Sequence, residues 1–186
     1  TAGNPKAPAK KIRVFDFDDT LARSNSQVLY EMPDGKTGKL NATQFAERSG
    51  QLESQGAVFD FSEFSKVVDG KKGPVFKAIE NIVAKRGAED VFILTARPAD
   101  AAGPIKQFMD ALGVKLPIEN IVGLGDGKAQ AKARWITGKA AEGYNDFLFV
   151  DDAYKNVKAV KEALEVFDVK SKTQQAKVAF ASKDLS

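Results

Sequence analysis

The sequence predicts an α/β fold in which a doubly wound, parallel five-stranded sheet carries helices on both faces. Short apolar runs alternate with helical patterns along most of the 186 residues, an order typical of parallel strands joined by right-handed crossover helices. Three of these runs also end in polar or charged residues. With 43% hydrophobic and 28% charged residues, the chain has the size and composition of one globular domain with a sizeable core.

The first strand is expected around residues 12–17, where β-branched and aromatic side chains suit a central strand that is buried on both faces. Later apolar runs predict strands at 91–94, 118–122, 147–150 and 166–169. Apolar residues recur at helical spacing between these runs. The predicted helices begin near Pro74, Ile105, Lys128 and Val157.

Residues 24–73 interrupt the alternation of strands and helices. Pro33-Asp34-Gly35 is a turn signal between two short strand patterns, 28–32 and 36–40, so it predicts a β-hairpin. Asn41, with Gln44 three residues later, indicates the start of a short helix.

That helix is expected to end at Gly50. An aromatic cluster follows it, at Phe59, Phe61 and Phe64. We expect these rings to pack against the main domain, and the alternative is a lid wall over a site. The insertion is therefore predicted to be a small flap or cap without a sheet-scale core.

Both ends of the chain differ in composition from its centre. Residues 1–10, which include Gly3, Pro5 and Pro8, are expected to form a flexible arm, and 171–186 a polar C-terminal tail. This leaves residues 11–170 for the α/β domain. Because the chain begins at Thr1, we expect it to be processed or to be part of a larger polypeptide.

The composition excludes several kinds of chemistry. The sequence contains no cysteine and no histidine, which removes disulfides, thiol nucleophiles, His/Cys zinc sites and His-based triads. Catalysis would have to use Asp, Glu, Lys, Thr, Ser or a hard metal ion. No apolar run is long enough to span a membrane and no signal peptide is visible, so we expect a cytoplasmic protein without a membrane partner.

Polar side chains follow three of the predicted strands. Asp16, Asp18 and Asp19 end the first, Thr95 and Arg97 follow the strand at 91–94, and Asp151-Asp152 follow the strand at 147–150. The carboxyl ends of parallel strands meet at one edge of the sheet, where ligands bind. Carboxylates are ligands that Mg²⁺ prefers, so a bound Mg²⁺ would offset the repulsion among these acids.

These motifs resemble those of the haloacid dehalogenase (HAD) superfamily of phosphohydrolases. Residues 16–20, Asp-Phe-Asp-Asp-Thr, fit the family's DxDxT motif, Thr95 fits its second motif and Asp151-Asp152 fit the fourth. The resemblance spans roughly residues 11 to 170. It implies a HAD-like, Rossmann-like fold with a flap or small cap after strand one, and it places strand one in the middle of the sheet, beside strands two and four.

Phosphoryl transfer needs an in-line nucleophile and a proton source for the leaving group. Asp16 is the candidate nucleophile, which would form an aspartyl-phosphate. Asp18 is the candidate general acid and base, and strand alternation lets it share a pocket with Asp16. The resemblance implies the same two roles.

The metal ligands expected from the resemblance are Asp16, the backbone carbonyl of Asp18, Asp152 and, as a second ligand or an orienter of water, Asp151. Asn156 stands where many family members have a further acid, a departure that leaves one fewer negative charge.

The remaining candidates bind the phosphoryl group or balance its charge. The substrate-binding set consists of Thr20, Thr95, Ala96 and Arg97. Thr95 could instead cap the next turn, and Arg97 could pair with an acid. For the lysine of the third family motif we favour Lys132, because of its position ahead of Trp135-Ile136, and Lys128 is the alternative. The two lie four residues apart on one helix face, so spacing does not separate them.

The leading hypothesis is a Mg²⁺-dependent phosphohydrolase that cleaves a phosphomonoester. Its phosphorylated substrate would be a small molecule, a nucleic-acid end or a phosphoprotein. Transfer to an acceptor other than water would use the same residues. The alternative is a non-catalytic HAD-like structural or binding module of a larger protein, because residues 144–160 also resemble HAD-type domains of tailed-bacteriophage proteins.

Overall fold

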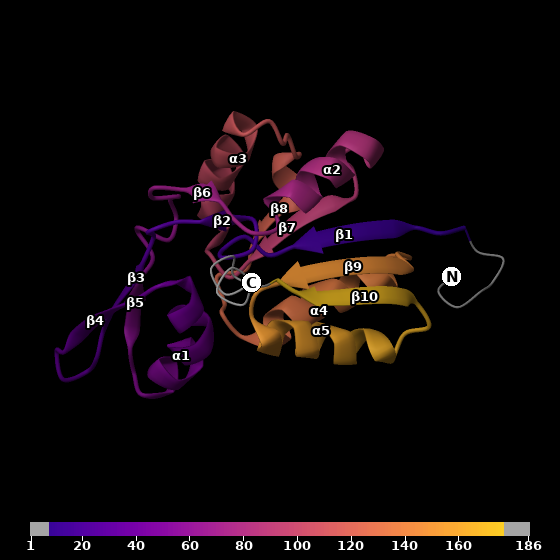
Figure 1. Ribbon diagram of the computed structural model, residues 1–186. Coiled ribbons are helices and arrows are strands. Elements are labelled where there is room, and N and C mark those ends of the chain that lie inside the picture. Colours follow the sequence, from indigo (N-terminus) through magenta and orange to yellow (C-terminus); the bar gives the residue numbers. More distant parts are fainter. Residues whose placement is uncertain (1–7, 177–186) are drawn as a thin grey trace, which may run out of the picture.

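A parallel five-stranded sheet forms the centre of the protein. The computed structural model describes residues 8–176. The strand order is β10-β9-β1-β7-β8, with β1 (Lys11–Phe15) between β9 (Asp146–Asp151) and β7 (Val91–Thr95) (Figure 1). The α/β class, the parallel five-stranded sheet and the central position of the first strand are confirmed.

Helices cover both faces of this sheet, which gives a three-layer, Rossmann-like arrangement (Figure 1). On one face lie α2 (Phe76–Arg86) and α3 (Ala102–Ala111), and on the other lie α4 (Ala129–Ala141) and α5 (Tyr154–Glu165). Short 3₁₀ turns precede α3 and β8 (Ile121–Gly123). Their bounds are Ala99–Ala101 and Ile118–Asn120.

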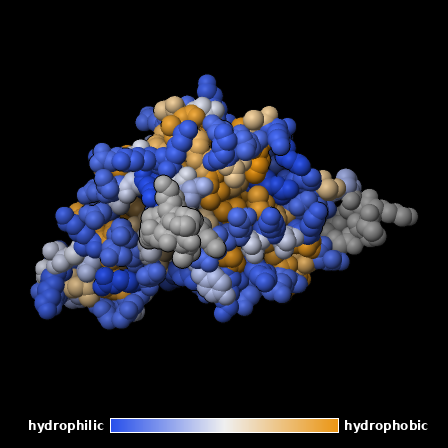
Figure 2. All heavy atoms as spheres, in the orientation of Figure 1, coloured by the Kyte–Doolittle hydropathy of each residue, from blue (hydrophilic) through white to orange (hydrophobic). Residues whose placement is uncertain are grey.

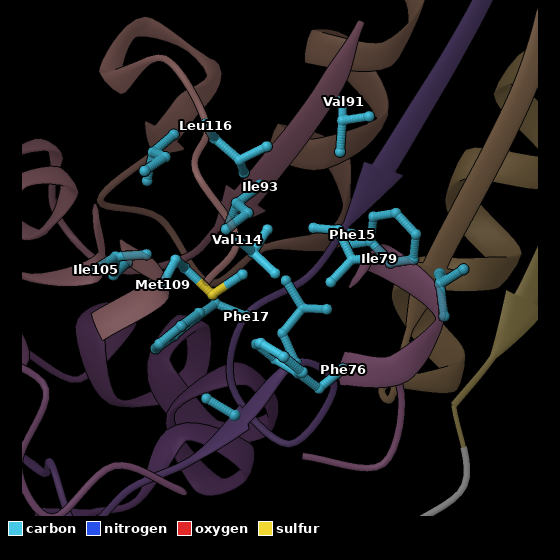
Figure 3. Close-up of a cluster of buried hydrophobic side chains, with 14 of the residues drawn as sticks. Phe15, Phe17, Phe76, Ile79, Val91, Ile93, Ile105, Met109, Val114 and Leu116 are labelled. Carbon is cyan, nitrogen blue, oxygen red and sulfur yellow. The ribbon is translucent and has the colours of Figure 1, made fainter. Parts of the chain in front are cut away.

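The alternation of side chains along β1 explains why the strand is hydrophobic on both faces. Ile12 and Val14 belong to the cluster beneath α4 and α5, whereas Phe15 and Phe17 belong to the cluster beneath α2 and α3. Figure 3 shows Phe15 and Phe17 packed with residues of α2, β7 and α3, among them Met109. These two clusters hold β1 rigidly, so the residues at its carboxyl end have fixed positions.

Residues 24–73 form a compact insertion beyond the carboxyl ends of the strands (Figure 1). At its base, β2 (Ala22–Arg23), which directly precedes the insertion, pairs with β6 (Lys71–Lys72). Its body is one helix and a three-stranded antiparallel sheet in the order β4-β3-β5. These elements are β3 (Val28–Glu31), β4 (Thr37–Leu40), α1 (Ala42–Ser54) and β5 (Val58–Asp60).

The local signals in the insertion predicted its first half correctly. Strands β3 and β4 pair as the expected hairpin around Pro33-Asp34-Gly35, where Gly35 has a φ of 87°. Asn41 and Gln44 form a complete capping box at the start of α1, with bonds of 2.8 and 2.9 Å. The expected end at Gly50 is wrong, because α1 continues to Ser54.

The insertion has a hydrophobic core of its own, formed by its strands and α1. This contradicts the expectation of a flap without a sheet-scale core whose apolar residues pack mainly on the main domain. Phe45 of α1 makes edge contacts with Phe59, Phe61 and Phe64, each at a ring-centroid distance of 5.6 Å. Ala96 is the main-domain residue in this cluster. The aromatic cluster therefore packs mainly within the insertion, because α1 supplies the opposing apolar surface.

The sheet also ends later in the chain than expected. The strand predicted at 166–169 is wrong: Val166 is 82% exposed, and the edge strand β10 is Lys170–Gln175, parallel to β9. The domain thus extends beyond residue 170 into the predicted tail. Of the predicted arm, residues 1–7 lie outside the described residues, as do 177–186 of the tail, while Lys10 bonds to Asn145 at 2.7 Å.

We predict that Phe45→Ala destabilises the insertion more than the main sheet. Phe45 is 3% exposed, and truncation of a buried Phe typically costs about 3–5 kcal/mol. Amide hydrogen exchange should become faster in α1, β3 and β5 and stay unchanged in β1 and β7. Val166→Ala is the control, since an exposed truncation should have little effect. Equal loss of protection in β1 and β7 would contradict a separate core.

The molecular surface differs between the insertion and the main domain. In the view of Figure 2 the insertion is mainly hydrophilic, whereas hydrophobic side chains reach the surface between α2 and the β9–β10 end of the sheet. Within residues 8–176, no helix is both long and apolar enough to cross a lipid bilayer.

Candidate active site

A narrow cleft lies between the carboxyl ends of the central strands and helix α1 of the insertion. Its floor comes from the loops after β1 and β9 and from α4, and its roof comes from small residues of α1. The lining residues are Asp16, Asp18, Asp19, Ala42, Thr43, Ala46, Phe64, Ala96, Gly127, Lys132, Asp151, Asp152, Ala153 and Asn156. The space open to water-sized spheres is about 30 Å³, enough for about two water molecules.

Asp16 and Lys132 form the buried centre of this cleft. Asp16 is the first residue after β1, and its backbone N–H donates to the Val150 carbonyl at 2.9 Å. Lys132, 2% exposed on α4, donates to Asp16 Oδ1 at 2.7 Å and to Asp151 Oδ2 at 2.8 Å. A buried ammonium held between two carboxylates keeps both of them in fixed positions.

Three carboxylates converge in a way that suits a metal ion. Asp16, Asp151 and Asp152 each offer one oxygen, and these three atoms lie within 4.8 Å of one another. Asp151 is fixed further by the backbone N–H of Ala153 at 2.9 Å and by Asn156 Nδ2 at 3.1 Å. This acidic triad can bind a metal ion.

Charge and hydrogen bonding both fit a divalent cation at this triad. Three carboxylates face one ammonium, so the cluster has a net charge of −2 when all four groups are ionised. The Oδ1 atom of Asn156, a buried residue that lines the cleft, has no hydrogen-bond partner among the described residues. A buried acceptor normally has a partner, and a water held by a cation would supply one.

The protonation of the triad follows from its burial. Burial, and then the neighbouring charge of Asp151, raises the pKa of Asp16 to about 6, against the opposing effect of Lys132. Burial and the charge of Asp16 raise the pKa of Asp152 to about 10. Burial alone would lower the pKa of Lys132, but Asp151 and Asp16 raise it overall, so this lysine stays charged. Without a cation, the triad therefore retains a proton at neutral pH.

A pH-dependent loss of stability follows for the metal-free protein. The folded-state pKa values of Asp16 and Asp152 lie above the unfolded value of 3.8. The stabilisation that these two carboxyl groups give to the folded state is complete below a pH of 3.8. It is lost as the pH rises through about 6 for Asp16 and about 10 for Asp152. Between about pH 5 and about pH 9, the wild type should lose melting temperature relative to Asp152→Asn, which lacks the carboxyl group.

Added Mg²⁺ should remove this difference by displacing the retained proton. The measurement is thermal melting of both proteins across this pH range, with chelator and then with Mg²⁺. Parallel melting curves for wild type and variant in chelator would contradict the raised pKa values.

Asp18 lies in the same cleft but pairs with a cation. Arg97 is fully buried and donates from Nε to Asp18 Oδ2 at 2.9 Å and from a terminal nitrogen to Oδ1 at 2.6 Å. Arg97 was expected either to contact the substrate or to pair with an acid, and in this structure it pairs with an acid. Asp18 is not a member of the carboxylate triad found within residues 8–176.

The other expected residues differ in how close they come to the cleft. Thr20 is buried and donates to Asp16 Oδ2 at 3.1 Å, or alternatively to Asp152 Oδ1 at 3.4 Å. Ala96 lines the cleft. Thr95 Oγ1 instead accepts the Arg97 N–H at 3.1 Å, which is the turn-capping use, and it is absent from the described lining. Lys128 is exposed at the start of α4, so Lys132 is the lysine of the cleft.

Sequence reasoning missed two contacts between the insertion and the cleft. Asp19 has a left-handed backbone, φ 60°, and accepts from Thr43 Oγ1 of α1 at 3.0 Å. The ammonium of Lys155, on α5, bonds to the Ala46 carbonyl and to the Gly127 carbonyl. The third acid of the first motif was a signal for Asp19, whereas no local pattern marks Lys155.

The comparisons with known proteins leave the family open. No protein-family model matches the chain, and no curated protein matches it either. A solved structure described as "Structure of DsGPDH of Dunaliella salina" is similar at a TM-score of 0.42 and 18% identity, over 94% of this chain and 26% of that one. The chain spans about a quarter of that protein's length, and a likeness this weak carries no argument about function.

Proposed function

We propose that the chain is a Mg²⁺-dependent, HAD-like phosphohydrolase that cleaves a phosphomonoester through an aspartyl-phosphate at Asp16. The observation that carries the proposal is the buried group at the carboxyl end of the central strand. It consists of Asp16, Asp151 and Asp152, with oxygens within 4.8 Å of one another, and Lys132 between two of them. This group offers a nucleophilic carboxylate, oxygen ligands for a hard cation and a fixed positive charge in one place.

In the first step, a carboxylate oxygen of Asp16 would form a bond to phosphorus while the bond from phosphorus to the ester oxygen breaks. In the second step, water would attack the phosphorus of the acyl phosphate, which releases inorganic phosphate and restores the carboxylate. Two moderate barriers then replace one large barrier. When bound at the triad, Mg²⁺ would neutralise charge on the phosphoryl oxygens.

The other side chains would support these two steps. Lys132 keeps the Asp16 carboxylate ionised and oriented through its bond of 2.7 Å and lowers the repulsion between this carboxylate and a phosphate dianion. Asp18 would protonate the leaving alkoxide and later take a proton from the attacking water. For this role the Asp18 carboxyl has to exchange its contact with Arg97 for one with the substrate.

The cleft in this structure is too small for a phosphorylated substrate, since it has room for only about two water molecules. Helix α1 would therefore have to move away from the loops after β1 and β9 to admit one. Motion of an inserted cap is a common way to admit a substrate and then exclude water.

Turnover of a generic aryl phosphate, with Mg²⁺ and after chelation, tests this proposal. We expect release of inorganic phosphate that is abolished by chelator and restored by Mg²⁺. Titration calorimetry should show one Mg²⁺ site in the wild type and weaker binding in Asp152→Asn. No turnover across aryl and alkyl phosphates, together with no Mg²⁺ binding, would exclude the enzyme and favour a binding or structural module.

A further inference from the structure

Arg97 is more than a partner of Asp18, because it also bonds to both ends of the insertion. Its side chain is fully buried. Besides its two bonds to Asp18, the guanidinium donates to Ser24 Oγ at 2.9 Å. Residues 24–26, which follow β2 into the insertion, are called the outgoing stalk. On the returning stalk, residues 64–68, it donates to the carbonyls of Phe64, at 3.3 Å, and Lys66. The guanidinium also lies over the Phe64 ring, with its carbon 4.7 Å from the ring centroid.

The two stalks meet at this guanidinium. Ser26 Oγ donates to the Lys66 carbonyl at 2.8 Å and accepts from Val68 N–H at 3.0 Å, while Asn25 N–H donates to the Val68 carbonyl at 2.7 Å. Strand β7 holds Arg97 from the main domain, two residues beyond its end at Thr95. One buried cation therefore connects β7, the loop that carries Asp18 and both chain segments of the insertion.

These contacts depend on one another. A buried guanidinium that loses its acidic partner becomes an uncompensated charge, and its remaining hydrogen bonds lose favourable geometry. Loss of the Asp18 charge should therefore weaken the hydrogen bonds from Arg97 to the two stalks. Displacement of the stalks should in turn expose Asp18 and Arg97 to water.

We propose that Arg97 is a positioning residue that couples the seating of the insertion to the orientation of the Asp18 carboxyl. With the insertion seated as in this structure, both carboxyl oxygens of Asp18 face Arg97. Displacement of the insertion removes the stalk contacts and gives Asp18 freedom to turn toward a substrate. The structural coupling stands on these contacts alone, whereas its meaning for catalysis rests on the function proposed above.

The structural part is tested by amide hydrogen exchange at Asn25 and Val68, without substrate. We expect exchange at both amides to accelerate at least tenfold in Arg97→Lys, which keeps the charge but loses the planar fork. Asp18→Asn should accelerate the same amides, although it leaves Arg97 and every stalk residue in place. Amides of β1 and β9 should keep their protection in both variants.

Arg13→Met is the matched control, because Arg13, in the middle of β1, pairs at 3.5 Å with Asp146, the first residue of β9, away from the cleft. It should leave Asn25 and Val68 unchanged. Unchanged exchange at Asn25 and Val68 in a folded Asp18→Asn protein would overturn the coupling, and so would equal acceleration in Arg13→Met. Neither result depends on enzymatic activity, so failure here is distinct from failure of the proposed function.

The catalytic part is tested by comparing two substrates in an active preparation. Arg97→Lys should raise the ratio of kcat for ethyl phosphate to kcat for p-nitrophenyl phosphate at least tenfold. In the variant Asp18 no longer has to leave a bidentate partner, and only the alkoxide leaving group needs this acid. KM should change in the same proportion for both substrates. An equal loss of kcat on both would indicate a merely structural residue and overturn the positioning role.

Discussion

Asp16→Asn is expected to abolish most of the turnover while the fold persists. The replacement keeps the size of the side chain and removes the charge that would attack phosphorus. We expect turnover to fall by at least the factor of roughly 10²–10⁴ that one catalytic group typically supplies. In metal-free buffer the melting temperature should stay level or rise. Burial and then the charge of Asp151 raise the pKa of Asp16, and burial and then the charge of Asp16 raise that of Asp152, so loss of the Asp16 charge relieves repulsion.

The measurement is turnover of an aryl phosphate together with thermal melting in chelator. Asp34→Asn is a suitable control, since Asp34 is exposed in the hairpin turn far along the insertion. Full activity in Asp16→Asn would end the covalent mechanism. A large drop in melting temperature without metal would instead favour a structural role for these acids.

Lys132→Met is expected to have the largest effect on stability. Lys132 is buried against Asp16 and Asp151, and removal of one partner from a buried ionic group typically costs about 3–5 kcal/mol. Here the loss leaves Asp16 and Asp151 without their ammonium, beside the third carboxylate, Asp152. Mg²⁺ should recover part of the lost stability, because a cation at the triad would replace the missing positive charge.

Chemical denaturation with and without Mg²⁺ measures this effect, and Lys128→Met is its matched control. Lys128 is exposed at the start of the same helix, so its replacement should change the free energy of unfolding by less than about 0.5 kcal/mol. Equal effects of the two replacements would contradict the assignment of Lys132 to the site.

The sequence predicted those features of the fold that depend on neighbouring residues. The hairpin around Pro33-Asp34-Gly35 and the Asn41 cap are set by local turn and cap chemistry, so they were correct. The three strands that end in polar residues are apolar because both of their faces are buried, and their order along the chain identified the edge at which the acids meet.

Features that depend on distant contacts escaped prediction. Strand β10, with the sequence Lys-Ser-Lys-Thr-Gln-Gln, is almost wholly exposed and has no apolar pattern. The strand exists because its backbone pairs with β9. The apolar run at 166–169 was predicted as the strand instead, because it has the hydrophobic pattern that β10 lacks. The insertion core was not predicted because it depends on a tertiary contact. Phe45, on α1, packs against the three aromatic rings that follow later in the chain.

The candidate site shows the same limit. The spacing of the third motif fits Lys128 and Lys132 equally well. Their burial separates them, because Lys132 is buried in the cleft and Lys128 is exposed. The bidentate pair of Asp18 and Arg97 joins residues 79 positions apart, so no local pattern distinguished it from a contact with substrate. Convergence of Asp16, Asp151 and Asp152 was predictable, because topology alone brings the ends of adjacent parallel strands together.

The proposed mechanism requires that Asp16 itself becomes phosphorylated. Its most direct test is peptide mass spectrometry of Asp18→Asn, quenched in acid during turnover of p-nitrophenyl phosphate with Mg²⁺. This leaving group needs no proton, so the acyl phosphate can form, while the lost general base slows its hydrolysis. We expect one added phosphoryl group on Asp16, and no such group in the double variant that also carries Asp16→Asn. Steady turnover with Asp16 unmodified, or the modification on another residue, would contradict it.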